Sequence, residues 1–170
     1  MGEVMTAHHV QAVLDALSQS GLRVWVDGGW GLDALLGEQT REHEDLDIVA
    51  EMATLDSLVT TVGRLGYAIA EDHLPTRLVL RAGDRRQVDV HPVTFDQSGT
   101  GWQVGAGPDG SDCPYPADGF TVGRIGGREV GCLSAALQVS HHTGYEPSEI
   151  DRHDMRLLSE RLEVPLPPPY

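Results

Sequence analysis

Three aspartates of this sequence lie on segments that are otherwise apolar. Asp45 and Asp47 stand two residues apart at the start of one such segment, and Asp89 lies between two valines on a later one. Side chains alternate along a β-strand, so Asp45 and Asp47 project to the same side. Charged groups on an apolar strand are costly unless they are paired or hold a cation. We therefore expect the three carboxylates to converge on one patch of a sheet and to hold a divalent metal ion, with Mg²⁺ suited to the oxygen ligands and Mn²⁺ as a substitute.

A glycine pair precedes the aspartates, between a short apolar strand and a short helix. Gly28 and Gly29 leave the backbone bare, which would let a triphosphate approach the amides at the helix N-terminus, where the helix dipole favours anions. Arg41 lies just upstream of the aspartates and would clamp the triphosphate. The alternatives are structural: a tight turn for the glycines, a salt bridge to Glu44 for Arg41, and solvated or salt-bridged carboxylates for the aspartates.

Two histidines are close to the same constellation. His91 follows Asp89 by two residues and shares its strand face, and His43 is expected to orient the neighbouring carboxylates. The sequence contains adjacent histidine pairs as well, but neighbours on a helix point to different faces, so we expect no zinc site from them. Trp30 is expected to pack its helix rather than to stack on a base.

The elements that position these residues can be predicted from hydrophobic periodicity and from glycine and proline breaks. We expect a loop over 96–119, with Trp102 and Val104 as its buried residues, and an irregular tail over 164–170. The hairpin turn between the strands at 77–81 and 87–93 is expected at Gly83 and Asp84. The predicted helices cover 6–20, 30–36, 54–65, 134–142 and 148–161, and the predicted strands cover 22–26, 46–50, 67–70, 77–81, 87–93 and 128–133.

Composition excludes several classes of protein. The 170 residues carry 26 acidic and 12 basic side chains, all of the basic ones arginine, for a formal charge of −14. This balance argues against nucleic-acid binding and favours a cationic small molecule or a divalent metal as partner. We expect no membrane span and a cytoplasmic location, because no apolar run is long enough and the N-terminus does not resemble a signal peptide. Cys113 and Cys132 are expected to be ordinary thiols.

Three motifs carry a resemblance to a known family. The segments 24–33 (VWVDGGWGLD), 40–48 (TREHEDLDI) and 88–92 (VDVHP) resemble antibiotic nucleotidyltransferases of the DNA polymerase β superfamily. The similarity is greatest to lincosamide nucleotidyltransferases and next to aminoglycoside 2″-nucleotidyltransferases, and it continues into 74–77, 132–134, 142–145 and 151–154. The resemblance implies an α/β (α+β) polymerase β-like fold, with a mixed sheet flanked by helices and a C-terminal helical segment.

The resemblance also implies a reaction. A nucleoside monophosphate passes from a nucleoside triphosphate, with ATP expected, to a hydroxyl of a lincosamide or, second, an aminoglycoside. Two magnesium ions would be held by Asp45 and Asp47, and Asp89 would be either a metal ligand or the base that removes the hydroxyl proton.

On the same basis the chain divides into a nucleotidyltransferase core over 1–95 and an acceptor side over 96–170, in one continuous compact unit. His91, His142 and Tyr145 are expected near the acceptor, and a homodimer is implied. Two other functions stay open: transfer to a biosynthetic metabolite, and a non-catalytic or antitoxin-like nucleotide-binding protein.

Overall fold

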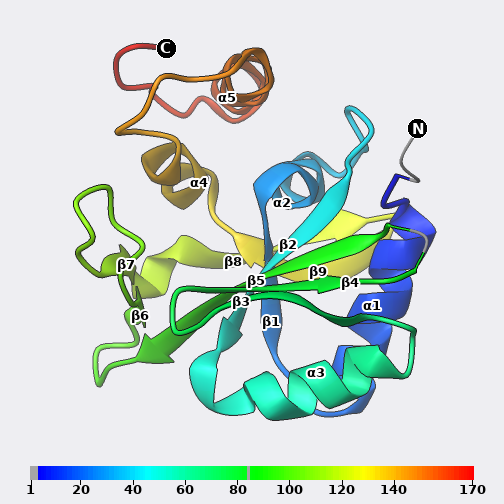
Figure 1. Ribbon diagram of the computed structural model, residues 1–170. Helices are drawn as coiled ribbons and strands as arrows, with labels where there is room; N and C mark the ends of the chain where they lie inside the picture. Colours follow the sequence, from blue (N-terminus) through cyan, green and yellow to red (C-terminus); the bar gives the residue numbers. More distant parts are fainter. Residues whose placement is uncertain (1–3, 84) are drawn as a thin grey trace.

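The computed structural model describes residues 4–83 and 85–170 and is a mixed α/β structure, which confirms the predicted fold class (Figure 1). The turn expected at Gly83 and Asp84 falls partly on Asp84, which lies outside the described residues. The helices are α1 (Ala7–Gln19), α2 (Gly28–Leu36), α3 (Leu55–Gly63), α4 (Ala135–His141) and α5 (Glu149–Leu162). The strands are β1 (Val24–Asp27), β2 (Asp45–Glu51), β3 (Ala68–His73), β4 (Arg77–Arg81), β5 (Gln87–Phe95), β6 (Gly101–Gln103), β7 (Cys113–Tyr115), β8 (Phe120–Ile125) and β9 (Arg128–Leu133).

The strands form one mixed sheet in the order β3-β4-β5-β2-β1-β9-β8, with the short β6 and β7 attached beyond β5. β1 is antiparallel to β2, whereas β2 is parallel to β5 and β1 is parallel to β9. The strands β2 and β5, which carry the predicted aspartates, are therefore neighbours in the middle of the sheet, next to β1, which leads into the glycine pair. α1 and α3 lie on one side of it, and α2, α4 and α5 lie on the other (Figure 1).

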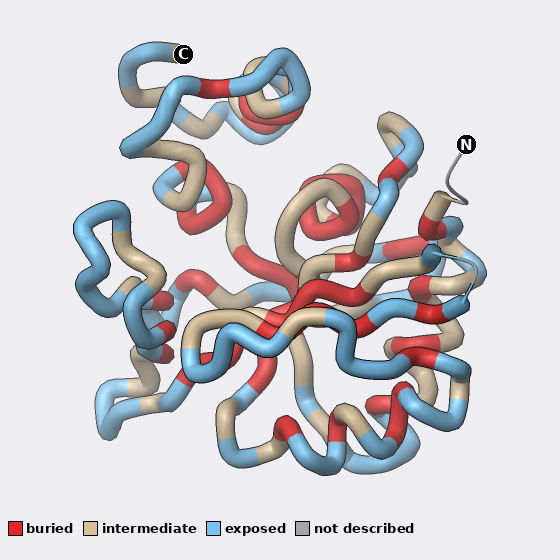
Figure 2. The backbone as a smooth tube through the Cα atoms, in the orientation of Figure 1, coloured by how far each residue is buried: buried red, intermediate tan, exposed pale blue. Residues whose placement is uncertain are grey.

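Strand alternation separates an apolar face of the sheet from a functional one. On β2, the residues Leu46, Ile48 and Ala50 point into the main core, which includes residues of α1 and α3. The intervening Asp45 and Asp47 point to the opposite side. Figure 2 shows the buried residues concentrated along the central strands and on the helix faces turned toward them. The core thus fixes which face of each central strand carries the polar side chains.

Local sequence accounts for the helix boundaries next to the site. α2 starts at Gly28, two residues before the predicted start, because the Asp27 carboxylate accepts a hydrogen bond from the Gly28 amide and caps the helix. α2 ends at Gly37, whose φ of 73° is left-handed. Ser134 and Ser148 cap α4 and α5, as the sequence indicates.

The segment after β5 differs from the prediction. Residues 96–119 are not one loop, because they contain the antiparallel strands β6 and β7. Trp102 and Val104 were expected to be buried but are 39% and 41% exposed. A further difference is β8, an unpredicted edge strand with an interior glycine: a Cβ at Gly123 would collide with the Ala34 carbonyl, where α2 crosses the strand.

Among the described residues, no helix is both long and apolar enough to cross a lipid bilayer. Cys113 and Cys132 are free thiols, and burial raises the pKa of both.

Candidate active site

Strand register brings three carboxylates to one level of the sheet. Asp27 of β1 lies opposite Asp47 of β2, and Asp47 lies beside Asp89 of β5. Asp45 precedes Asp47 on the same face and is paired in register with Gln87. The structure therefore brings together the predicted aspartates and adds Asp27, which sequence reasoning missed as a site residue. Its signal was a charged residue that ends an apolar strand directly before the glycine pair.

Asp47, Asp89 and His91 form a group that fits a cation. One potential ligand atom from each residue lies within 4.8 Å of the others. The His91 Nε2 atom is 3.0 Å from Asp47 Oδ1, so the two side chains are oriented toward each other. Two carboxylates and one imidazole are a donor set that suits divalent metals. Asp45 is outside this group, although its pKa responds to the charges of Asp47 and Asp89.

The electrostatics of the cluster reflect crowded negative charge. Burial, followed by the charges of Asp47 and Asp89, raises the pKa of Asp45 to about 6. For His91, burial opposes the charged form, but the hydrogen bond and charge of Asp47 outweigh it and raise the pKa to about 9. Both shifts indicate a site that attracts positive charge.

Arg77 is the counterion that sequence reasoning did not assign. Its Nε and Nη2 atoms donate to the two oxygens of Asp89 at 2.7 and 2.5 Å. The Asp89 side chain is 6% exposed and that of Arg77 is 40% exposed. Val79 pairs with Asp89 across β4 and β5, and Arg77 is two residues from Val79 on the same face. The spacing of two residues between Arg77 and Val79 could therefore have predicted this contact, but only once the pairing of β4 with β5 was known.

The glycine pair allows three side chains to approach the start of α2. Gly28 has a φ of 59°, and a Cβ there would collide with the Asp47 carboxylate. A Cβ at Gly29 would collide with the His43 ring and the Arg41 guanidinium. The Gly28 amide is already used by the Asp27 carboxylate, at 2.7 Å. Close packing of the site is thus one reason for both glycines.

His43 makes its hydrogen bond to Asp33 of α2 and not to the aspartates of β2 and β5, contrary to the expectation. It is 3% exposed, and its Nε2 atom lies 2.5 Å from Asp33 Oδ2 on α2. Its ring packs on Trp30, which is buried and donates its indole N–H to the Met5 carbonyl, so the packing role expected for Trp30 is confirmed. His43 fixes the segment before β2 to α2 because its partner is on that helix.

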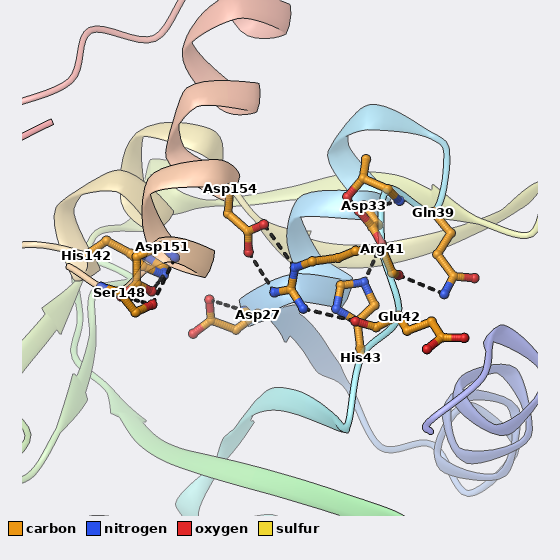
Figure 3. A network of polar contacts seen from close by, with 12 residues as sticks. Asp27, Asp33, Gln39, Arg41, Glu42, His43, His142, Ser148, Asp151 and Asp154 are labelled. Carbon is orange, nitrogen blue, oxygen red and sulfur yellow. Dashed lines mark hydrogen bonds and ion pairs between the residues drawn. The ribbon is translucent and has the colours of Figure 1, made fainter. Parts of the chain in front are cut away.

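Arg41 lies beside the site but pairs with α5. Its Nε and Nη2 atoms donate to the Asp154 carboxylate at 3.0 and 2.7 Å, as Figure 3 shows. The hydrogen bond to Asp154 raises the pKa of Arg41 despite its partial burial. The carboxylate partner is therefore Asp154, 113 residues away, rather than Glu44. A contact at this sequence distance has no local signal.

A cleft of about 720 Å³ opens over the carboxylates. Its floor includes Asp27, Asp47 and His91, and one wall is formed by residues 140–145, at the end of α4 and in the connection to α5. His142 and Tyr145, expected near the acceptor, line this wall. The structure thus brings them to the same cleft as Asp47.

The β6–β7 unit closes one side of the cleft. Gln103 donates to the Thr76 carbonyl at 2.8 Å and accepts from the Tyr115 hydroxyl at 2.6 Å. Its amide nitrogen is 3.4 Å from His91 Nδ1. Burial raises the pKa of Tyr115, which keeps its hydroxyl protonated as a donor. The segment expected as a loop therefore supports the site through a defined polar chain.

Comparison with known proteins gives consistent relationships. The chain matches the family model of aminoglycoside-2″-adenylyltransferases over residues 9–158. A lincosamide resistance protein of Staphylococcus haemolyticus is 31% identical over 146 residues, which are 86% of this chain and 89% of that protein. A 2″-aminoglycoside nucleotidyltransferase of Klebsiella pneumoniae is 31% identical over 115 residues, 68% of this chain and 62% of that protein.

Solved structures agree in fold. The lincomycin-bound lincosamide antibiotic adenylyltransferase LnuA superimposes with a TM-score of 0.81 at 29% identity, covering 92% of this chain and 98% of that chain. ANT(2″)-Ia in complex with adenylyl-2″-tobramycin gives a TM-score of 0.74 at 23% identity, covering 92% of this chain and 88% of that chain.

Proposed function

Because the chain belongs to the aminoglycoside-2″-adenylyltransferase family, it is a nucleotidyltransferase, and we propose that it transfers a nucleoside monophosphate to a hydroxyl of a small antibiotic. A lincosamide is the first candidate acceptor and an aminoglycoside the second. The lincosamide resistance protein is matched over 89% of its length, against 62% for the aminoglycoside enzyme. The family description makes ATP the nucleotide to test first.

The observation that carries this proposal is the row of Asp27, Asp47 and Asp89 on adjacent strands, of which Asp27 and Asp47 line the cleft. Asp47, Asp89 and His91 would hold a divalent cation, and Asp45 would contribute to a second one. Bound Mg²⁺ would neutralise the phosphates and stabilise the charge that develops during phosphoryl transfer. The number of metal ions, and which carboxylates bind each ion, are part of the proposal.

The side chains of this protein would accept the proton of the acceptor hydroxyl and hold the reacting groups in position. The acceptor oxygen attacks the α-phosphorus, the bond to the leaving pyrophosphate breaks, and the hydroxyl proton passes to Asp89. Arg77 holds both oxygens of Asp89 and so fixes the direction in which the carboxylate points. Arg41 would contact the triphosphate by exchanging its bonds to Asp154 for bonds to phosphate. The amide of Gly29 would contribute to the same anion site.

The two parts of the chain would have different functions. Residues 1–95 would carry the chemistry, and residues 96–170 would form the acceptor side, including His142 and Tyr145. We propose a homodimer as the assembly, which light scattering after size-exclusion chromatography would measure directly.

The test is a mass-spectrometric assay of the pure protein with Mg²⁺, each of the four nucleoside triphosphates, and a panel of lincosamides and aminoglycosides. We expect one compound to gain the mass of one nucleoside monophosphate. Hydrolysis of the triphosphate without transfer to an antibiotic, or transfer to a metabolite instead, would overturn the assignment of the acceptor. Either result would leave the assignment as a nucleotidyltransferase unchanged. Binding of triphosphate without turnover on any acceptor would favour a non-catalytic role.

A further inference from the structure

The segment 164–170 lies outside the family match, which ends at residue 158, yet it is attached to the cleft. It follows α5 and has no helix or strand of its own. Val164, Leu166 and Tyr170 pack against the cluster of Leu32, Val139, Met155 and Leu158. Figure 1 shows the segment turning back along α5 toward the connection between α4 and α5. The prediction of an irregular tail is confirmed, but the tail is packed.

Two hydrogen bonds join this segment to the rest of the acceptor side. The Tyr170 hydroxyl donates to the His142 carbonyl at 2.7 Å. Arg152 on α5 donates to the Pro169 carbonyl at 3.2 Å, and its other Nη atom donates to Glu146 at 3.1 Å. The segment therefore bonds directly to His142 at the end of α4, and through Arg152 of α5 it is linked to Glu146 in the connection between α4 and α5.

That connection is the wall of the cleft. Residues 142–145 line the cleft opposite Asp47, and no regular element holds them. His142 is fixed by its own Nδ1 atom, 2.7 Å from the Gln138 carbonyl, and by the Tyr170 hydroxyl on its carbonyl. Thr143 follows His142, and the next two residues, Gly144 and Tyr145, are exposed. The position of the wall thus depends on a bond made by the last residue of the segment.

Burial and charge support the same placement. Burial, followed by the charges of Asp151 and Tyr170, raises the pKa of Tyr145. Tyr145 and Tyr170 are therefore close enough to interact, on either side of His142. The Asp151 carboxylate is 3.7 Å from His142 Nε2 and 2.8 Å from the backbone and side chain of Ser148, which ties the start of α5 to the same point.

We propose that the segment 164–170 is a brace for the acceptor wall and that Tyr170 is a positioning residue for acceptor binding. Tyr170 takes no part in the reaction, because it contacts the backbone of the wall and does not line the cleft. The brace should therefore control acceptor affinity and leave triphosphate binding and the chemical step unchanged. The effect on the acceptor rests on the proposed function, whereas the effect on the wall does not.

The test compares Tyr170→Phe, which removes only the hydroxyl, with Pro165→Ala, an exposed position in the same segment. A second variant ends the chain after Pro167 and so keeps Val164 and Leu166 in the cluster. Hydrogen–deuterium exchange follows the peptide over 139–148, where the His142 amide donates to Val139, and the peptide over 45–51 as internal reference. Steady-state kinetics give the KM of the acceptor, the KM of the triphosphate and kcat.

We expect Tyr170→Phe to accelerate exchange in 139–148 and to raise the acceptor KM about threefold to tenfold, the effect of one lost hydrogen bond. Exchange in 45–51, kcat and the triphosphate KM should match those of Pro165→Ala. Unchanged exchange in 139–148 would overturn the brace whatever the acceptor is. Faster exchange with an unchanged acceptor KM would overturn its role in acceptor binding.

The proposed function is judged separately, from turnover by the unmodified protein. If that protein modifies none of the antibiotics, the proposed function fails, and the exchange data still decide the brace. A global loss of structure in the shortened chain would appear in its circular dichroism, and Tyr170→Phe would then carry the decision.

Discussion

The two sides of the cleft are built in different ways. The floor is built on the row of Asp27, Asp47 and Asp89, of which Asp27 and Asp47 line the cleft and Asp89 is buried beside them. Each of the three is held in the sheet by hydrogen-bonded neighbouring strands. The wall, residues 140–145, covers the end of the seven-residue helix α4 and an irregular connection, which a few side-chain bonds hold in place. Backbone pairing thus fixes the floor, whereas individual side chains fix the wall.

This difference suggests a division between chemistry and selectivity. Groups that act on the phosphorus must be held in one geometry, and strand pairing in a packed sheet provides it. Groups that recognise the acceptor can vary without disturbing that geometry, because the wall lies outside the strand ladders. We expect variants of the floor to change kcat for every acceptor and variants of the wall to change KM for particular acceptors.

The largest effects should come from the floor itself. Asp89→Asn should lower kcat by about 10² to 10⁴ because it removes the proposed base, and Asp47→Asn should abolish turnover because it removes the central carboxylate of the row. Circular dichroism and isothermal titration with triphosphate and Mg²⁺ would show that the fold is intact. Asp96→Asn is the control, since Asp96 is exposed and its carboxylate bonds to Ser98, Thr100 and Trp102, none of which lines the cleft. Normal kcat in either floor variant would contradict the assignment.

The next effect tests whether the floor tolerates a small displacement. Gly28→Ala would place a methyl group on the Asp47 carboxylate, so we expect kcat to fall about 10²-fold. Gly37→Ala is a matched control, because Gly37 also has positive φ but a methyl group there would meet open space, with nothing within 4 Å. It should lose about 1 kcal/mol of stability and keep its activity. Equal activity losses in both variants would assign the effect to backbone strain.

A smaller effect concerns the counterion of the floor. Arg77→Ala leaves the buried Asp89 without its guanidinium partner and should lower stability by about 1 kcal/mol, since Arg77 is partly exposed. Mn²⁺ should raise the melting temperature of this variant more than that of the unmodified protein, because the ion replaces the missing charge. Arg81→Ala on the same strand is the control, as Arg81 pairs with Glu71 and Gln87 away from the floor. Equal Mn²⁺ shifts in all three proteins would exclude this coupling.

The ion pair of Arg41 with Asp154 on α5 gives a prediction in which the two partners have opposite effects on triphosphate binding. Arg41→Ala should raise the triphosphate Kd about tenfold if Arg41 binds phosphate. Asp154→Asn should leave that Kd unchanged or lower, because it releases Arg41 from its competing carboxylate. Titration calorimetry measures both. Weaker triphosphate binding in Asp154→Asn would instead show that the pair acts by holding α5 in place.

The sequence was sufficient to predict Asp45, Asp47 and Asp89 as neighbours, although not Asp27, because the pattern that marks them is local. Period-two alternation placed Asp45 and Asp47 on one face, and the apolar residues between them defined the core side. The sequence could not assign partners that depend on the tertiary structure. Arg77 and Asp154 are 12 and 113 residues from the carboxylate or guanidinium that they contact.

The wall side was harder to predict for a physical reason. β6 and β7 have three residues each, too few for a periodic pattern, and β8 is an edge strand with exposed side chains. Trp102 was expected to be buried by its residue type, but its indole N–H donates to Asp96 at the surface. Short elements stabilised by side-chain bonds leave little trace in hydrophobic periodicity.

The smallest predicted effect is a salt dependence of acceptor binding. Two acidic side chains of the 96–119 segment bond to neighbouring serines, Asp96 to Ser98 and Asp109 to Ser111, so neither is directed to an acceptor. Asp27 lines the cleft and remains as the candidate, contributing about 1 kcal/mol to an amine at a partly wet surface. Raising the salt concentration from about 0.05 to about 0.5 M should therefore raise the KM of an amine-bearing acceptor about twofold to fourfold. Asp27→Asn keeps a side chain that can cap α2, and it should raise this KM at low salt and flatten the salt dependence. A salt effect of equal size on a neutral acceptor would mean that the charge acts on the triphosphate instead.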